Sequence, residues 1–152
     1  MTTKAYTLLA SLVPRLQAIL VTNGYATNAG TSVLVGPVPR QDGESFPFIR
    51  LHETDAAPES AVPFRPSAKV RVQFTAEAAS EEKTAANIVA TGHKLVGDMK
   101  KALFGDVARD LNGKAIDARL EGYSIQPPEQ GSDVVIALVR GSFSFHDDFT
   151  TI

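Results

Sequence analysis

The sequence predicts a single α+β domain: a mostly antiparallel sheet with helices packed on one face. Two segments, 5–22 and 80–103, carry apolar residues at helical spacing, and 69–78 alternates apolar with polar residues as a half-buried strand does. A loop rich in Pro and Gly at 127–131 joins two further strand patterns. No internal repeat is visible, and 152 residues suit one domain.

The N-terminal segment predicts an amphipathic helix that is interrupted once. Its apolar stripe is Leu8, Leu9, Leu12, Val13, Leu16, Ile19 and Leu20. Pro14 lacks a backbone donor, so we expect it to kink the helix or to begin its second half. Asn23-Gly24 supplies a left-handed stop.

Two short strands are expected next, at 31–38 and 46–53, followed by the most irregular part of the chain. The segment 54–68 contains Pro58, Pro63 and Pro66. Proline at this spacing excludes a helix and a central strand, which predicts a long Pro-rich loop that could become ordered on assembly.

The strand at 69–78 is expected to have one buried face, formed by Val70, Val72, Phe74 and Ala76. Ser80 is placed to cap the following helix, with Glu81 and Glu82 in its first turn. The expected core stripe of this helix is Ala85, Ile88, Val89, Gly92, Leu95, Val96, Met99, Ala102 and Leu103. Gly92 would allow a neighbour to approach closely, and Gly105 is the stop.

The last two strands are expected at 116–125, with a bulge at Glu121-Gly122, and at 134–146. Val134, Ile136 and Leu138 make the start of the final strand apolar on both faces. This strand should therefore be central, or covered by something else.

Composition excludes several functions. The absence of cysteine removes disulfides, thiolate zinc sites and Cys nucleophiles. A net charge of -2 argues against a protein that mainly grips phosphate backbones. No apolar run is long enough to span a bilayer, so we expect no membrane association.

Motifs for catalysis are weak. Gly92 to Gly97 has the interval of a phosphate loop but lacks the following Lys and hydroxyl residue. His146-Asp147-Asp148 could hold a divalent cation, but consecutive strand residues point to opposite faces, so a solvated end is the favoured interpretation. Arg50, Lys69 and Arg71 could share one sheet face, where a polar outer surface is the default. We expect no catalytic residue, cofactor or metal, and hence no enzyme.

The order of elements is more informative. The strand at 46–51 (FPFIRL), the long Pro-rich loop, the strand KVRVQFTAEA, the helix SEEKTAANIVATGHKLVGDMKKAL and the last strand VVIALVRGSFSF follow an N-terminal helix. This layout resembles the tail terminator and tail-completion (minor tail) proteins of long-tailed bacteriophages, from about Leu8 to Phe145.

The resemblance implies a structural virion protein, assembled in the host cytoplasm and located in the virion tail. It would form a homo-oligomeric ring, usually a hexamer, that caps the tail tube and ends its polymerisation. Its partners would be the tail tube protein and a head completion or connector protein, and the ring would provide the surface for head-tail joining. DNA would pass through its lumen without specific binding, which a nearly neutral chain permits.

Within that interpretation, five residues are candidates for the subunit or tube interface. They are Arg40 and Asp42 in the turn at 36–45 and Glu59, Phe64 and Arg65 in the Pro-rich loop. Arginine and aromatic side chains are the usual interface anchors, although Phe64 could equally fold back on its own core.

Two alternatives stay open. A head-tail connector or neck protein would have a related fold. A cytosolic α+β small-molecule binding or hydrolytic domain would be favoured by a pocket with convergent polar groups between sheet and helix.

Overall fold

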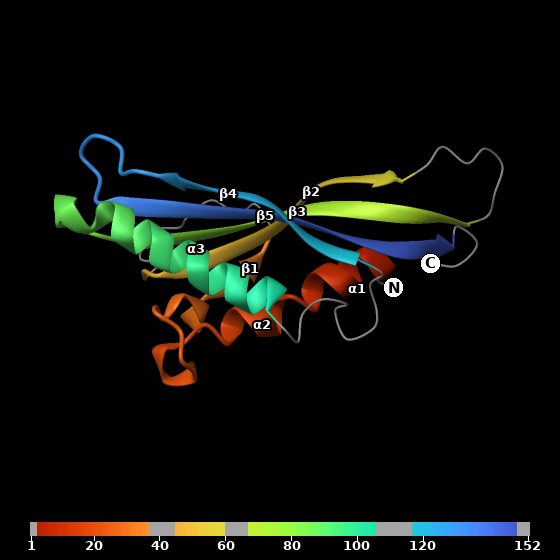
Figure 1. Cartoon of the computed structure of the whole chain (residues 1–152), viewed down its shortest axis with the longest axis horizontal. Helices are drawn as coiled ribbons and strands as arrows, with labels where there is room; N and C mark the ends of the chain where they lie inside the picture. Colours follow the sequence, from red (N-terminus) through yellow and green to blue (C-terminus); the bar gives the residue numbers. More distant parts are fainter. Residues whose placement is uncertain (1–2, 37–44, 60–66, 106–116, 149–152) are drawn as a thin grey trace.

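A computed structural model describes residues 3–36, 45–59, 67–105 and 117–148. It confirms the predicted class: one five-stranded, mostly antiparallel sheet with the helices on one face (Figure 1). The elements are α1 (Lys4–Ala10), α2 (Val13–Gln17), β1 (Val33–Val35), β2 (Phe48–Pro58), β3 (Ser67–Glu81), α3 (Ile88–Phe104), β4 (Asp117–Gln126) and β5 (Val134–Asp148).

The strand order is β1-β2-β3-β5-β4. β3 and β5 are antiparallel and pair along their whole length, from Ser67 opposite Asp148 to Glu81 opposite Val134. β2 and β4 join them antiparallel on either side, and short β1 pairs parallel with β2. The prediction that the last strand is central is therefore confirmed, since β5 lies between β3 and β4.

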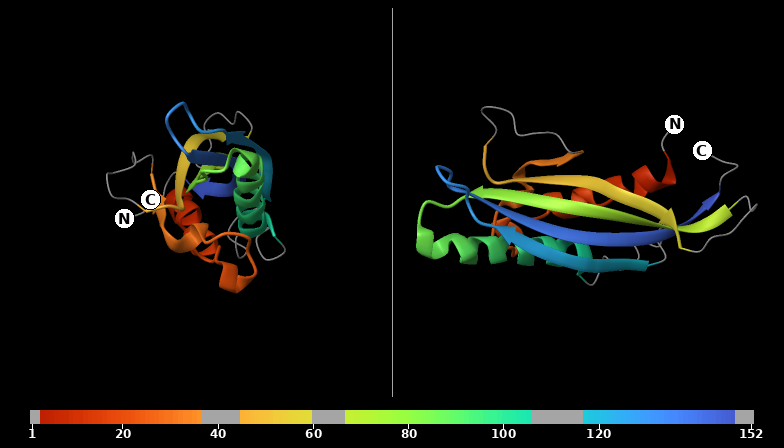
Figure 2. Two further views of the ribbon diagram at one scale, coloured as in Figure 1. Left: turned by 90° about the vertical axis from the view of Figure 1, so that its left-hand side faces the viewer. Right: turned by 90° about the horizontal axis from the view of Figure 1, so that it is seen from above.

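The core lies between the sheet and the helices. Val72, Phe74 and Ala76 of β3 are buried on the side that the helices cover, and Phe143 of β5 lies beside them. α1 packs beneath the β2 side of the sheet and α3 beneath the β4 side (Figure 2). All the described helices lie on this one face, so the predicted one-sided sheet is confirmed.

The N-terminal helix is divided as expected at Pro14, which lies in the first turn of α2. A proline is tolerated there because the first backbone N–H groups of a helix have no intrahelical partner. The chain then makes a 3₁₀ turn at Val21–Asn23, and Gly24 ends it with a φ of 86°. This left-handed conformation favours glycine, which confirms the predicted stop.

The predicted start of the second helix is wrong. Ser80 and Glu81 continue β3, because Val135 and Val134 of β5 pair with them, and α3 begins only at Ile88. Glu82 still acts near the helix start: its carboxylate accepts hydrogen bonds from the Thr84 N–H (3.0 Å) and the Thr91 hydroxyl (3.0 Å).

The predicted loop at 54–68 is too long at both ends. Residues 54–58 continue β2, and 67–68 begin β3. Pro58 is tolerated because this part of β2 lies at an edge of the sheet, where one side of the strand needs no donor. Residues 60–66 lie outside the described residues.

Helix α3 also anchors the loop that follows α2. Asp98, buried beneath the sheet, accepts hydrogen bonds from the backbone N–H groups of Ala26 (2.9 Å) and Thr27 (2.8 Å) and from the Thr27 hydroxyl (2.7 Å). Sequence patterning missed this contact, because Asp98 stands between the apolar residues of the core stripe and reads as a surface position.

Candidate functional site

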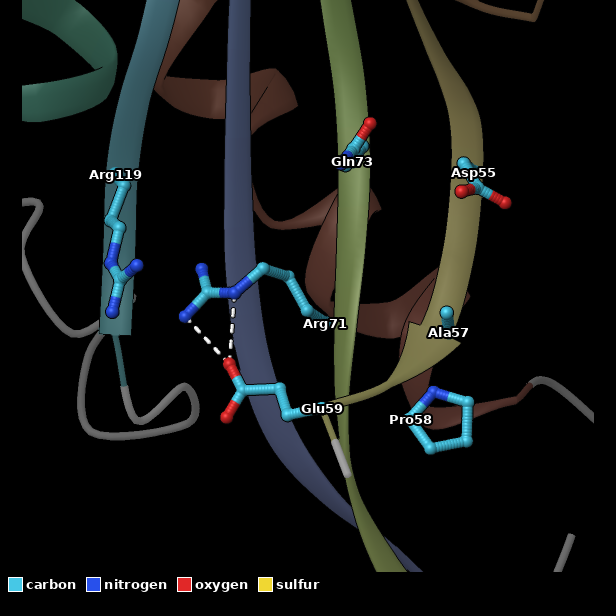
Figure 3. Close-up of a pocket in the computed structure, with 7 residues that line it drawn as sticks. All are labelled: Asp55, Ala57, Pro58, Glu59, Arg71, Gln73 and Arg119. Carbon is cyan, nitrogen blue, oxygen red and sulfur yellow. Dashed lines mark hydrogen bonds and ion pairs between the residues drawn. The ribbon is translucent and has the colours of Figure 1, made fainter. Parts of the chain in front are cut away.

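The uncovered face of the sheet has a hollow of about 500 Å³ near the ends of β2, β3 and β4. It is open to solvent and mostly polar (Figure 3). The residues that line it are Asp55, Ala57, Pro58, Glu59, Arg71, Gln73 and Arg119.

Arg71 of β3 is the centre of the hollow, and only 16% of its side chain is exposed. Its Nε donates to Glu59 Oε1 (2.8 Å), and its Nη2 lies 2.7 Å from the same oxygen. Nη1 donates to the Ser142 hydroxyl of β5 (2.9 Å), and Nη2 to Asp117 of β4 (3.1 Å). One guanidinium therefore links three strands and the residue that follows β2.

Glu59 has both carboxylate oxygens engaged. Oε2 lies 2.9 Å from Lys69 Nζ, and Oε1 also accepts a hydrogen bond from the Ser144 hydroxyl (2.8 Å). The bond from Lys69, followed by those from Ser144 and Arg71, lowers the pKa of Glu59 to about 2. The carboxylate is therefore ionised at neutral pH, which does not suit a general acid or base.

Asp117 and Arg119 form the β4 side of the same cluster. Arg119 Nε donates to Asp117 Oδ2 (2.7 Å), and Arg119 Nη2 lies 2.6 Å from that oxygen. This pairing, with a smaller contribution from Arg71, lowers the pKa of Asp117. The same pairing, with smaller contributions from Glu59 and Glu121, raises the pKa of Arg119. We call Glu59, Lys69, Arg71, Asp117, Arg119, Ser142 and Ser144 the ion network.

The ion network joins neighbouring strands of the sheet through side-chain ion pairs and hydrogen bonds. Each of its three cations contacts a carboxylate of Glu59 or Asp117, and the Ser142 hydroxyl also donates to Glu121 (2.6 Å). Opposite charges in contact favour the ionised form of a carboxyl group, which here lowers the pKa of Glu59 and of Asp117. The hollow moreover lies on the uncovered face, whereas apolar core side chains pack between sheet and helices.

Of the five predicted interface residues, the structure places only Glu59. Its contacts within the described residues are internal to the chain, in the ion network. Arg40, Asp42, Phe64 and Arg65 lie outside the described residues, so their role stays a prediction.

The three cations expected to share a sheet face do not act together. Lys69 and Arg71 join the ion network, whereas Arg50 is buried and stacks on Phe48, with 4.5 Å from its guanidinium carbon to the ring centroid. Sequence reasoning missed Asp117, Arg119, Ser142 and Ser144. Their spacing by two residues was a usable signal, since such pairs share a strand face.

His146, Asp147 and Asp148 form the end of β5, opposite Lys69, Ala68 and Ser67. Neither there nor elsewhere in the described part of the chain do three His, Asp or Glu side chains gather closely enough to hold a metal ion.

The two lateral edges of the sheet, at β2 and at β4, differ from each other. On one side β1 covers only Ile49–Leu51 of β2, so the rest of β2, from His52 to Pro58, has β3 as its only neighbour among the described strands. On the other side β4 pairs with β5 alone, and α3 lies beneath it. Within the described residues, the sheet therefore ends in two different edges that have no further strand beside them.

Comparison with protein-family models and with curated proteins finds no match for this chain in either. No helix within the described ranges is both long and apolar enough to cross a membrane.

Proposed function

We propose that this protein is a structural component of a phage tail, which assembles into a ring, usually a hexamer, at the end of the tail tube. The ring would end tube polymerisation and present the surface that joins the head. The proposal starts from the resemblance in element order. The α+β fold with a one-sided antiparallel sheet agrees with it.

The observation that carries the proposal is the pair of unlike open edges, β2 beyond Leu51 on one side and β4 on the other. A ring of identical subunits needs two different surfaces that bind each other head to tail. Two unlike edges at opposite ends of the strand order supply such surfaces, whereas a twofold dimer would need only one.

The polar groups of the hollow also favour a structural role over an enzymatic one. Glu59, Arg71 and Arg119, which line it, are held in ion pairs that join β3, β4 and the residue after β2, and Glu59 has its pKa lowered rather than moved towards neutral pH. Catalytic acids and bases are usually tuned towards the working pH.

Assembly tests the proposal directly. We expect sedimentation velocity over a concentration series to show the 16.2 kDa subunit passing into one larger closed species, and negative-stain images to show rings with a central hole. Added to tubes assembled from a tail tube protein, the ring should sit at tube ends and stop their growth. A subunit that stays monomeric at high concentration, and leaves tube growth unchanged, would contradict the proposal.

The candidate residues Phe64 and Arg65 have their own test. Phe64→Ala and Arg65→Glu should lower the ring fraction in native mass spectrometry if the Pro-rich loop reaches the next subunit or the tube. An unchanged ring fraction would show that the assignment of these two residues is wrong, without bearing on the ring itself.

A further inference from the structure

The open edge of β2 is acidic. Glu53 and Asp55 are exposed there, just beyond the part of β2 that β1 covers. Among the residues that the structure describes, neither carboxylate has an ion-pair partner. We call these two residues the acidic edge.

The opposite side of the sheet has a different surface, which we call the β4–α3 flank: Val89, His93, Lys100, Leu120 and Tyr123. Its apolar members are exposed, at 64% for Val89, 41% for Leu120 and 46% for Tyr123, so the prediction that Val89 belongs to the core stripe of the helix is wrong. Leu120 and Tyr123 follow each other on the helix-facing side of β4, on either side of the bulge. Val89, His93 and Lys100 share one stripe of α3.

Two members of the flank, Lys100 and His93, contact the Tyr123 ring. The Lys100 ammonium lies 5.1 Å from the centroid of the Tyr123 ring, and the His93 ring meets the same ring edge-on at 6.3 Å. Lys100 has no carboxylate partner within the described ranges. The flank is therefore an exposed aromatic and aliphatic patch with an unneutralised cation at its centre.

Both edges are poorly suited to pairing through the backbone. β2 changes register between Glu53 and Asp55, β4 changes register between Leu120 and Gly122, and Pro58 has no N–H to donate. Bulges and edge prolines prevent strand addition. A partner at either edge would therefore be bound through side chains.

We infer that the β4–α3 flank of one copy binds the acidic edge of a second copy. Lys100 would pair with Glu53, which shares the helix-facing side of the sheet with Phe74. Tyr123, Leu120 and Val89 would form the apolar centre of the contact, and Asp55, beyond the bulge on the other face, would add to the negative charge of the edge. Aromatic centres with charged rims are typical of protein interfaces, and complementary charges set the register. Because the two surfaces differ, the contact repeats head to tail. It rests on the proposed ring and assigns its subunit interface.

Charge reversal tests this contact without removing its apolar part. Variant A, Glu53→Lys with Asp55→Lys, places a basic edge against the basic flank. Variant B, Lys100→Glu, places an acidic flank against the acidic edge. We expect each variant alone to need at least about tenfold more protein than the wild type for half assembly, because like charges then face each other. Circular dichroism should show that both remain folded.

Mixing the variants gives the decisive measurement. The basic edge of A fits the acidic flank of B, and the acidic edge of B fits the unchanged flank of A. An equal mixture should therefore restore the ring, and native mass spectrometry should show equal numbers of A and B in it. Only a head-to-tail contact between these two surfaces predicts that complementation.

Matched controls are Lys94→Glu, which reverses an exposed charge on α3 off the flank stripe, and Glu129→Lys in the β4–β5 hairpin. Both should assemble as the wild type does. If the wild type forms rings and A and B do so equally well, this contact is wrong while the ring stands.

Two further results would overturn the contact. If A and B fail separately and their mixture also fails, a second copy does not occupy the flank, and an acidic segment of another protein becomes the better candidate. A wild type that never forms rings would overturn the contact together with the proposed function.

Discussion

Gly92 of α3 lies directly against Ile125 of β4. A Cβ atom at position 92 would come within 2.5 Å of Ile125 Cγ2, closer than two carbon atoms can approach. The glycine therefore lets the helix pack tightly on the edge strand, as its position in the stripe predicted. The proposed interface depends on this contact, because it sets α3 beside β4.

We expect Gly92→Ala to destabilise the protein. Alanine favours a helix by about 1 kcal/mol over glycine, but overpacking a filled core costs roughly 1–3 kcal/mol, and Ile125 is a branched side chain with little freedom to move. Urea denaturation should show a lower free energy of unfolding. Combined with Ile125→Ala, which removes Cγ2, the change should cost less than the sum of the two single changes; a stabilised Gly92→Ala variant would contradict the close contact.

Gly97→Ala is the matched control on the same helix and should have the opposite sign. Nothing lies within 4 Å of a Cβ at that position, which is exposed. Only the helical preference remains, so we expect a gain of up to about 1 kcal/mol in the free energy of unfolding. A loss of stability at Gly97 would mean that the effect at Gly92 is not specific to Ile125.

Asp98→Asn should loosen the attachment of the N-terminal loop to α3. The amide group keeps one acceptor where the carboxylate now serves two backbone donors and a hydroxyl. Hydrogen bonds to a charged group contribute about 1.5–3 kcal/mol, so we expect a loss of that order in urea denaturation. Thr27→Val keeps both backbone bonds to Asp98 and removes the hydroxyl, which donates to Asp98 and accepts a long bond from the Ala29 N–H (3.4 Å), and should cost less. Equal losses from the two variants would show that the backbone bonds add nothing.

The ion network should make the free energy of unfolding depend on pH in the acidic range. The pKa of Glu59 is about 2 in the folded protein against an ordinary 4.5, so the folded state binds the proton less readily than the unfolded state. Its contribution is complete above pH 4.5 and is lost as the pH falls towards about 2. Asp117, whose pKa is also lowered, acts in the same direction.

Glu59→Gln should therefore flatten the fall in unfolding free energy over that acidic range, while lowering stability at neutral pH. Denaturation curves at a series of pH values measure both effects. Glu129→Gln, an exposed change in the hairpin, should keep the wild-type slope. If the unfolding free energy of Glu59→Gln falls with pH as steeply as that of the wild type, the carboxylate does not pair with Lys69 and Arg71 in solution.

Much of the fold could be predicted because local patterns report burial. The alternation through Val70, Val72 and Phe74 marks the covered face of β3. Pro14 lies in the first turn of α2, and Gly24 ends the 3₁₀ turn that follows. The start of α3 could not be found this way. Ser80 and Glu81 have the chemistry of a helix cap, but strand partners some 50 residues later in the chain keep them in the sheet.

In the candidate site, too, contacts between distant segments could not be predicted from local patterns. Glu59 was singled out as an interface residue from its place in a Pro-rich segment, yet its described contacts are with Lys69, Arg71 and Ser144. No local sequence pattern relates Glu59 to Ser144. The register of β3 with β5, which pairs distant segments of the chain, brings the two residues together.

Local patterns in the sequence predict the class of the fold, the one-sided sheet, the central place of the last strand and the break at Pro14, since periodicity and proline act over a few residues. The ends of β2 and β3, the carboxylates that meet Arg71, and the edges left without a neighbour among the described strands could be found only from the three-dimensional structure. Those features depend on pairing between distant segments, where a hydrogen-bonded neighbour can extend a strand past a local stop signal.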